Sequence, residues 1–157
     1  MKINFARLIA AVLICEAAGV LGSVFTETGA GSWYSQLIKP EFNPPNWVFA
    51  PVWTLLYLLM AASIYILWEK KGSAGANHAI AAFSLQLFLN FLWSFLFFGL
   101  QSPLLGLVCI AFLWAAIIAT IYYSWRVSRP AALLLIPYIL WVSFAAVLNY
   151  SLFALNP

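Results

Sequence analysis

Long apolar runs constrain this chain more than any other feature. Five of them, at 6–27, 46–68, 78–100, 104–125 and 130–155, exceed the roughly 18 residues that a membrane-spanning helix needs. They do not alternate with the period of two that is typical of a transmembrane barrel strand. The chain is also 66% hydrophobic and 7% charged, which leaves too little polar surface for a soluble globule. The sequence therefore predicts an all-α membrane protein, a five-transmembrane-helix bundle in one domain over residues 1–157.

The first run follows Lys2 and Arg7, as the apolar part of a signal peptide would. The run is long, however, and no clear A-x-A cleavage site precedes Trp33. We therefore expect it to be retained as a transmembrane helix.

The cations predict an orientation in the membrane. Six of the seven precede the first run, follow the second or flank the link between the fourth and fifth: Lys2, Arg7, Lys70, Lys71, Arg126 and Arg129. Five crossings place these on one side and only Lys39 on the other. The positive-inside rule then predicts a cytoplasmic N-terminus and an outside C-terminus in a bacterial cell membrane. The net charge of +3 reflects this orientation, so we expect no nucleic-acid partner.

The longest link, at 28–45, contains breakers and also three aromatic residues, Trp33, Tyr34 and Phe42. Two interpretations remain open. The aromatic rings anchor the link at headgroup level, or the link folds as a lid over a cavity between the helices. Pro44 and Pro45 suit the first turn of the next helix, where a missing amide hydrogen costs nothing.

The second run places Trp53, Tyr57 and Met60 along one stripe of a helix, and Pro51 within it is expected to kink the helix or free a carbonyl. Irregular backbone at membrane depth must face protein or a polar space, so this stripe favours a cavity.

The third run places Asn90, Trp93, Ser94 and Phe97 on one face. Asn90 either makes an interhelical hydrogen bond worth ~0.6 kcal/mol or contacts a ligand, and both roles are compatible.

The fifth run repeats this pattern with Pro137, Trp141, Ala145 and Asn149. The small Ala145 beside Trp141 suits either close helix packing or a slot for a planar ligand.

Glu16 is the one ionisable residue well inside a predicted span, where a charge costs on the order of 3 kcal/mol. It is a functional candidate, or it is protonated or paired with a polar group such as Asn149.

Cys15 and Cys109 lie in mid-helix and are expected to be buried thiols rather than a disulfide or metal site. The single His78 has no neighbouring cluster of metal-binding residues in the sequence, and we find no nucleophile, base and orienting group. We therefore expect no metal, no cofactor and no conventional enzyme site.

These residues resemble the TspO/MBR family of tryptophan-rich sensory proteins, which includes the mitochondrial translocator protein. The matching stretches run in order from Trp33 to Tyr150: Trp33-Tyr34, Lys39-Pro40, Pro44-Pro45-x-Trp47-Val48-Phe49-x-Pro51-Val52-Trp53, Leu56-Tyr57, Asn90-x-x-Trp93, Phe97-Phe98-Gly99, Pro137-Tyr138-x-x-Trp141 and Phe144-Ala145-x-x-Leu148-Asn149-Tyr150.

The resemblance implies five helices, a homodimer and a pocket that binds porphyrins such as protoporphyrin IX and haem, benzodiazepine-site ligands and, in some members, cholesterol. Carried over by position, the pocket residues are Trp33, Tyr34, Pro44, Pro45, Trp53, Asn90, Trp141 and Ala145. The helix faces add Tyr57, Trp93 and Asn149 to the predicted ligand site, and Lys39 is expected to meet a porphyrin propionate.

Three functions fit this resemblance. The leading one is a receptor or sensor that binds porphyrin and is linked to tetrapyrrole regulation. The alternatives are a transporter, although the inverted repeats of secondary transporters are not evident, and light-dependent porphyrin breakdown with Trp53 and Trp141 as catalytic candidates.

Two features depart from the family pattern. No cation follows Arg129, so Tyr138 and Tyr150 cannot complete the cholesterol-recognition pattern, and cholesterol binding is not expected. The small-residue series Ala111, Ala115 and Ala119 lies on the fourth run, whereas we expect the dimer contact on the third.

Overall fold

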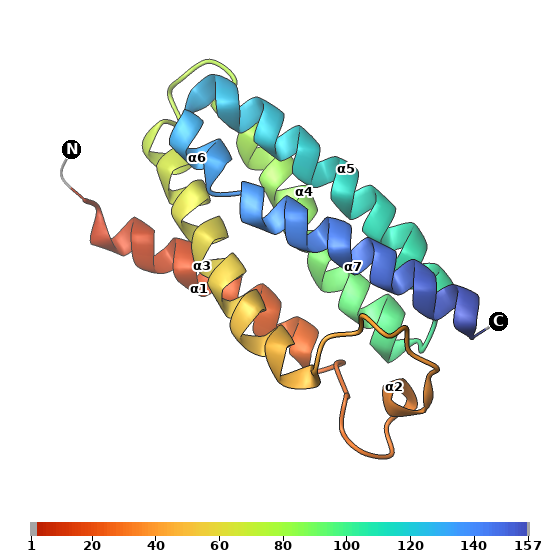
Figure 1. Ribbon diagram of the computed structural model, residues 1–157. Coiled ribbons are helices and arrows are strands. Elements are labelled where there is room, and N and C mark those ends of the chain that lie inside the picture. Colours follow the sequence, from red (N-terminus) through yellow and green to blue (C-terminus); the bar gives the residue numbers. More distant parts are fainter. Residues whose placement is uncertain (1–2, 157) are drawn as a thin grey trace.

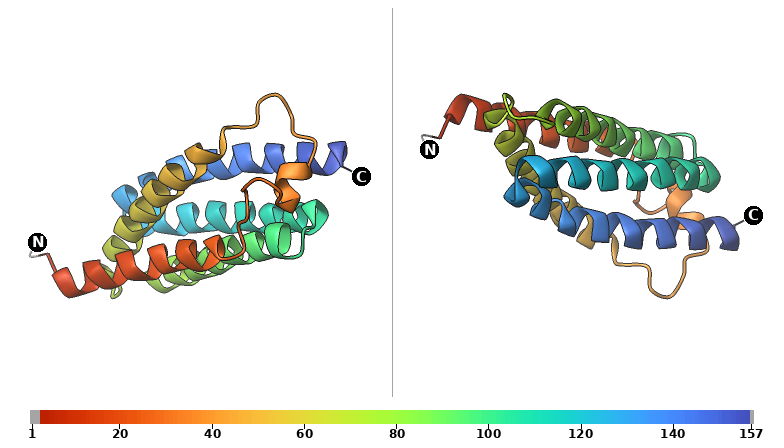
Figure 2. Two further views of the ribbon diagram at one scale, coloured as in Figure 1. Left: turned by 90° about the horizontal axis from the view of Figure 1, so that it is seen from below. Right: turned by 90° about the horizontal axis from the view of Figure 1, so that it is seen from above.

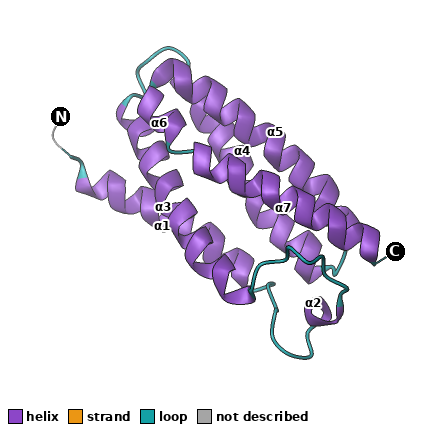
Figure 3. Cartoon of the chain, in the orientation of Figure 1, coloured by secondary structure: helices purple, strands orange, loops and turns teal. Residues whose placement is uncertain are grey.

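The computed structural model describes residues 3–156, which contain helices and links but no strand. Figure 3 shows this all-helical composition. The elements are α1 (Phe5–Ser23), α2 (Trp33–Gln36), α3 (Asn46–Glu69), α4 (Ala76–Ser94), the π-helix η1 (Phe95–Gly99), α5 (Pro103–Val127), α6 (Arg129–Leu133) and α7 (Ile136–Leu155). Five spans within this range are long and apolar enough to cross a membrane, so the predicted all-α bundle is confirmed. Lys2 lies outside the described residues.

The helices pack as neighbours around a common interior. Helix α1 contacts α3 and α4, while α5 contacts α4, α6 and α7 (Figures 1 and 2). Large apolar side chains such as Leu13, Phe112 and Leu140 are more than half exposed on the outside. In a soluble protein such a surface would drive aggregation, whereas here it suits contact with lipid. The chain is an integral membrane protein.

Proline positions explain where two helices begin and break. Pro45 is the N-cap of α3 and Pro44 precedes it, so both prolines lie just before the helix and not in its first turn as predicted. The predicted helix over 130–155 is interrupted between Leu133 and Ile136. Pro137 has no amide hydrogen, and its ring clashes with the carbonyl group four residues earlier, which is that of Leu133. Pro51, near the start of α3, leaves that helix continuous.

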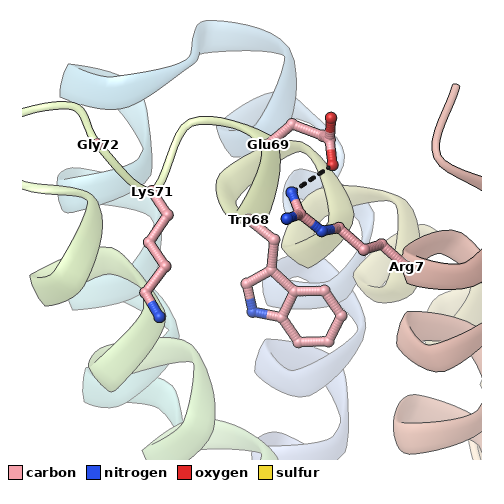
Figure 4. Close-up of a pocket in the computed structure, with 5 residues that line it drawn as sticks. All are labelled: Arg7, Trp68, Glu69, Lys71 and Gly72. Atoms are coloured by element: carbon pink, nitrogen blue, oxygen red, sulfur yellow. Dashed lines mark hydrogen bonds and ion pairs between the residues drawn. The ribbon is translucent and has the colours of Figure 1, made fainter. Parts of the chain in front are cut away.

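The described cations other than Lys39 gather at one end of the bundle. Nη1 of Arg7 on α1 lies 3.0 Å from Oε1 of Glu69 at the end of α3, as Figure 4 shows. Nζ of Lys70 lies 3.4 Å from the carbonyl oxygen of Val127 at the end of α5. A surface cavity of about 470 Å³ lies here, and it is lined by Arg7, Trp68, Glu69, Lys71 and Gly72. The sequence-based grouping of these charges therefore agrees with the fold, while the side of the bilayer that this end faces stays a prediction.

Candidate functional site

The loop between α1 and α3, residues 24–45, folds against the opposite end of the bundle (Figure 1). Tyr34 is only 4% exposed, and its ring lies 5.5 Å from that of Phe98 between centroids. The ring of Trp33 lies 5.6 Å from that of Phe97, and the ring of Phe42 lies 6.3 Å from that of Phe144. These aromatic side chains hold the loop on the helix ends. The packing therefore favours the folded-loop interpretation over free interfacial anchors.

Tyr34 also forms a polar contact within this loop. Its hydroxyl donates a hydrogen bond to Oδ1 of Asn43 over 3.1 Å. Burial raises the pKa of Tyr34 above its ordinary value, although the hydrogen bond from the side chain to Asn43 lowers it. The phenol consequently stays protonated at neutral pH and keeps this bond.

Asn156 ties the loop to the end of α7. The Ile38 amide donates to Oδ1 of Asn156 over 2.9 Å, and Nδ2 of Asn156 donates back to the Ile38 carbonyl over 3.0 Å. The same Nδ2 reaches the Leu152 carbonyl at 2.8 Å, which fixes the side chain on its own helix. One asparagine thus pairs both backbone groups of Ile38.

Asn156→Ala is expected to loosen this loop. Losing both bonds to Ile38 removes about 1.4 kcal/mol, which corresponds to roughly tenfold faster exchange of the Ile38 amide if exchange proceeds by local opening. Hydrogen exchange followed by mass spectrometry on loop peptides measures this, with Ser151→Ala on the same helix as control. Equal exchange in both variants would show that Asn156 does not restrain the loop.

A cavity of about 420 Å³ lies between α1, α3 and α4. Half of its lining residues are aromatic, aliphatic or glycine, and the other half carry a hydroxyl, amide or carboxyl group. The lining residues are Glu16, Gly19, Val20, Ser23, Thr26, Thr28, Asn46, Phe49, Ala50, Trp53, Thr54, Tyr57, Asn90, Trp93, Ser94 and Phe98. We call this the larger cavity.

A smaller cavity of about 40 Å³ lies toward α7 and beneath Tyr34. Its lining consists of Tyr34, Phe49, Trp53, Trp93, Phe97, Phe98, Trp141, Ala145, Leu148, Asn149 and Leu152. Four side chains, Phe49, Trp53, Trp93 and Phe98, line both cavities. We call these four the aromatic wall, because they separate the two spaces with ring surfaces.

The fold distributes the predicted ligand residues between these spaces. Trp53, Tyr57, Asn90 and Trp93 line the larger cavity, and Trp53, Trp93, Tyr34, Trp141, Ala145 and Asn149 line the smaller one. Four predicted residues line neither space: Trp33, Lys39, Pro44 and Pro45. Trp33 instead supports the loop through Phe97, and the two prolines precede α3.

Lys39 lies in the loop rather than in either cavity. Its Nζ is 3.3 Å from the carbonyl oxygens of Ser35 and Leu37 and 4.7 Å from the centre of the Tyr34 ring. These contacts hold the ammonium group on the loop itself. The expected contact with a propionate stays a prediction, and it requires the side chain to leave these partners.

Sequence reasoning missed three residues that shape the site. Phe49 and Phe98 complete the aromatic wall, yet a phenylalanine in an apolar run carries no signal that separates a cavity from lipid. Gly19 matters because of the side chain it lacks. A Cβ there would lie 2.4 Å from Cε2 of Tyr57, so only glycine lets that ring approach α1.

Two buried amides bind two tyrosines and one tryptophan around the cavities. Oδ1 of Asn90 accepts from the Tyr57 hydroxyl, and its Nδ2 donates to the Tyr138 hydroxyl over 3.0 Å. Oδ1 of Asn149 accepts from the Trp93 indole over 3.0 Å, and its Nδ2 donates to the Pro103 carbonyl over 2.8 Å. Both amides are therefore structural partners as well as lining residues.

The π-helix η1 brings successive rings inward at one end of the aromatic wall. Phe95 accepts from the Leu100 amide over 2.9 Å, a five-residue spacing that widens the turn. The ring of Phe97 stacks on Trp93 at 5.1 Å between centroids and meets Phe98 edge-on at 4.8 Å. The predicted helix over 78–100 holds as a span, but its last turn is not α-helical.

Two buried polar side-chain atoms at the cavities have no hydrogen-bond partner within residues 3–156. These are Oε1 of Glu16, in the larger cavity, and Nε1 of Trp141, in the smaller one. The predicted alternative that Glu16 pairs with Asn149 is wrong, because Asn149 binds Trp93 and Pro103.

Comparison with known proteins identifies the family of this chain. The model of the TspO/MBR family matches residues 11–155, which include every residue that lines the two cavities. The chain belongs to the TspO/MBR family.

Relatives match this TspO/MBR chain over nearly its whole length. It is 48% identical to the tryptophan-rich protein TspO of Archaeoglobus fulgidus, over 98% of this chain and 99% of that protein. It is 36% identical to the translocator protein of Bos taurus, over 92% of this chain and 86% of that protein. It is 31% identical to the tryptophan-rich sensory protein of Cereibacter sphaeroides, over 99% and 95%. The resemblance predicted from the motifs is thereby confirmed.

Proposed function

We propose that this protein is a membrane receptor or sensor that binds a porphyrin, or a similar planar and mostly apolar molecule, against the aromatic wall. The observation that carries the proposal is the sharing of Phe49, Trp53, Trp93 and Phe98 by two adjoining cavities. The larger cavity, at about 420 Å³, falls in the size range of small-molecule sites. Broad aromatic faces favour offset or edge contacts with a flat π-system.

The unpaired indole of Trp141 supports the same proposal. Its buried N–H finds no acceptor within residues 3–156, and a buried donor without a partner is costly. A carboxylate or carbonyl oxygen on a bound ligand would supply that acceptor. Movement of the wall side chains would then join the smaller cavity to the larger one and admit a tetrapyrrole.

The assembly and orientation are part of this proposal. We infer a homodimer in a bacterial cell membrane, with the cation-rich end and the N-terminus in the cytoplasm, from the distribution of charge and from the family. The porphyrin site would then open toward the outside, on the side of the loop. Names of relatives include both a sensory protein and a translocator protein, and binding is the step that both descriptions need.

Substituting the cavity tryptophans is expected to weaken protoporphyrin IX binding. Trp141→Phe removes the unpaired donor and Trp53→Phe removes part of the wall, and each change is expected to weaken affinity about tenfold. The measurement is a titration in the dark, followed by quenching of tryptophan fluorescence in detergent. Trp125→Phe, a half-exposed tryptophan near the cation-rich end, is the control. Unchanged affinity in both cavity variants would refute the proposed site.

A further inference from the structure

The larger cavity contains one carboxyl group, and that group has no hydrogen-bond partner in the described part of the chain. Glu16 lies on α1 and lines the cavity, and its Oε1 is buried without a hydrogen bond. None of the cations within residues 3–156 lines this cavity. Arg7, on the same helix, is paired with Glu69 at the end of the bundle. The cavity therefore offers an acceptor whose matching donor the protein itself does not provide.

Neighbouring hydroxyl groups strengthen this acceptor character. Three of them have already donated their hydrogen to a backbone carbonyl, from Ser23 to Val20, from Thr26 to Gly22 and from Thr54 to Ala50. Their oxygens keep free lone pairs and can only accept further bonds in this arrangement.

The other polar groups on the lining do not change this preference for a hydrogen-bond donor. Nδ2 of Asn46 donates one hydrogen to the Thr28 carbonyl, which leaves its second N–H as a neutral donor and its amide oxygen as an acceptor. Thr28, Ser94 and Trp53 keep neutral donors, but Glu16 is the one acidic or basic side chain on the lining over residues 3–156. The electrostatic preference of the cavity is therefore set by a carboxylate.

We propose that the larger cavity binds an organic ammonium ion, whose protonated amine pairs with Glu16 and whose apolar body lies against Trp53 and Trp93. A charge-assisted hydrogen bond to a carboxylate is stronger than a neutral one, and it relieves an unpaired acceptor at membrane depth. Aromatic faces at the same site favour a cation as well. This inference does not depend on porphyrin binding, because it rests on the carboxyl group of Glu16, whereas the proposed porphyrin contacts are the aromatic wall and the Trp141 indole.

Isothermal titration calorimetry on the whole protein in phosphatidylcholine nanodiscs tests the proposal, with the signal of empty discs subtracted. The probes are 2-naphthylmethylamine and 2-naphthoate, which share an aromatic body and carry opposite charges. The wild type is expected to bind the amine saturably and at least about tenfold more tightly than the carboxylate. Glu16→Gln is expected to lose about tenfold in amine affinity, and naphthoate affinity is expected not to fall.

Two further variants separate the proposal from loss of fold and from the porphyrin site. Glu27→Gln removes an exposed carboxylate on the adjoining loop, outside the cavity lining, and is expected to bind the amine as the wild type does. Ala50→Phe narrows the cavity while keeping Glu16, and it is expected to abolish amine binding. Equal amine affinity in Glu16→Gln and wild type, or equal affinity of wild type for both probes, would overturn the proposal. Protoporphyrin IX titrations on the same discs measure porphyrin binding separately. Loss of amine binding without loss of porphyrin binding, or the reverse, therefore tells the two proposals apart.

Discussion

Gly106→Val is expected to lower the free energy of unfolding by about 3 kcal/mol, the upper end of the cost of overpacking a core. Gly106 on α5 is buried where α5 meets η1 and α7. A Cβ at this position would lie 2.8 Å from Cδ2 of Phe97 and 2.9 Å from Oδ1 of Asn149. Moving either side chain is costly, because Phe97 stacks on Trp93 and both ends of the Asn149 amide are hydrogen-bonded.

Gly29→Val is the matched control for this substitution. Gly29 lies in the first loop with no heavy atom within 4 Å of an added Cβ. Reversible unfolding in mixed detergent micelles, followed by tryptophan fluorescence, compares the two variants. We expect the Gly29 variant to unfold at the wild-type midpoint. The Gly106 variant is expected to unfold at a clearly lower mole fraction of the denaturing detergent. Coincident midpoints would show that α5 can move away from η1 at little cost.

Asn90→Leu is expected to destabilise the bundle by about 2 kcal/mol, because it leaves the Tyr57 and Tyr138 hydroxyls buried without a partner. Interhelical hydrogen bonds in membranes are worth about 0.6 kcal/mol on average. The expected loss of about 2 kcal/mol is larger than this average, because the substitution leaves two hydroxyl groups without partners and does not merely remove one bond. The same unfolding assay measures the change.

A triple variant distinguishes orphaned hydroxyls from lost packing. Combining Asn90→Leu with Tyr57→Phe and Tyr138→Phe removes every polar member of the network, and an apolar replacement of all partners is close to neutral. The triple variant is therefore expected to recover most of the stability that Asn90→Leu loses. If it is instead less stable than the single variant, packing at Asn90 dominates and the polar network does not.

Hydropathy was sufficient to predict the five spans, because every crossing must bury about 20 apolar residues in lipid. It was insufficient where backbone geometry depends on one residue. Pro137 lies in the predicted helix over 130–155 and breaks it, and η1 replaces the last α-helical turn of the third span. An α-helix, a π-helix and a break can have the same hydropathy. Hydropathy alone therefore does not predict these features.

Faces of single helices were predictable, whereas contacts between helices were not. The four-residue spacing correctly grouped Trp141, Ala145 and Asn149 at one cavity. Pairing across helices requires knowledge of which helices are neighbours, and periodicity does not contain it. For this reason pairing with a polar group such as Asn149 stood among the alternatives for Glu16, although Asn149 binds Trp93 and Pro103.

The most direct test of the proposed function is a crystal structure of the protein with zinc protoporphyrin IX, in which anomalous scattering from the zinc marks the position of the ligand. We predict a single strong anomalous peak per chain inside the bundle, at the aromatic wall formed by Phe49, Trp53, Trp93 and Phe98. Peaks confined to the lipid-facing surface of the helices, with both cavities unchanged, would contradict the account.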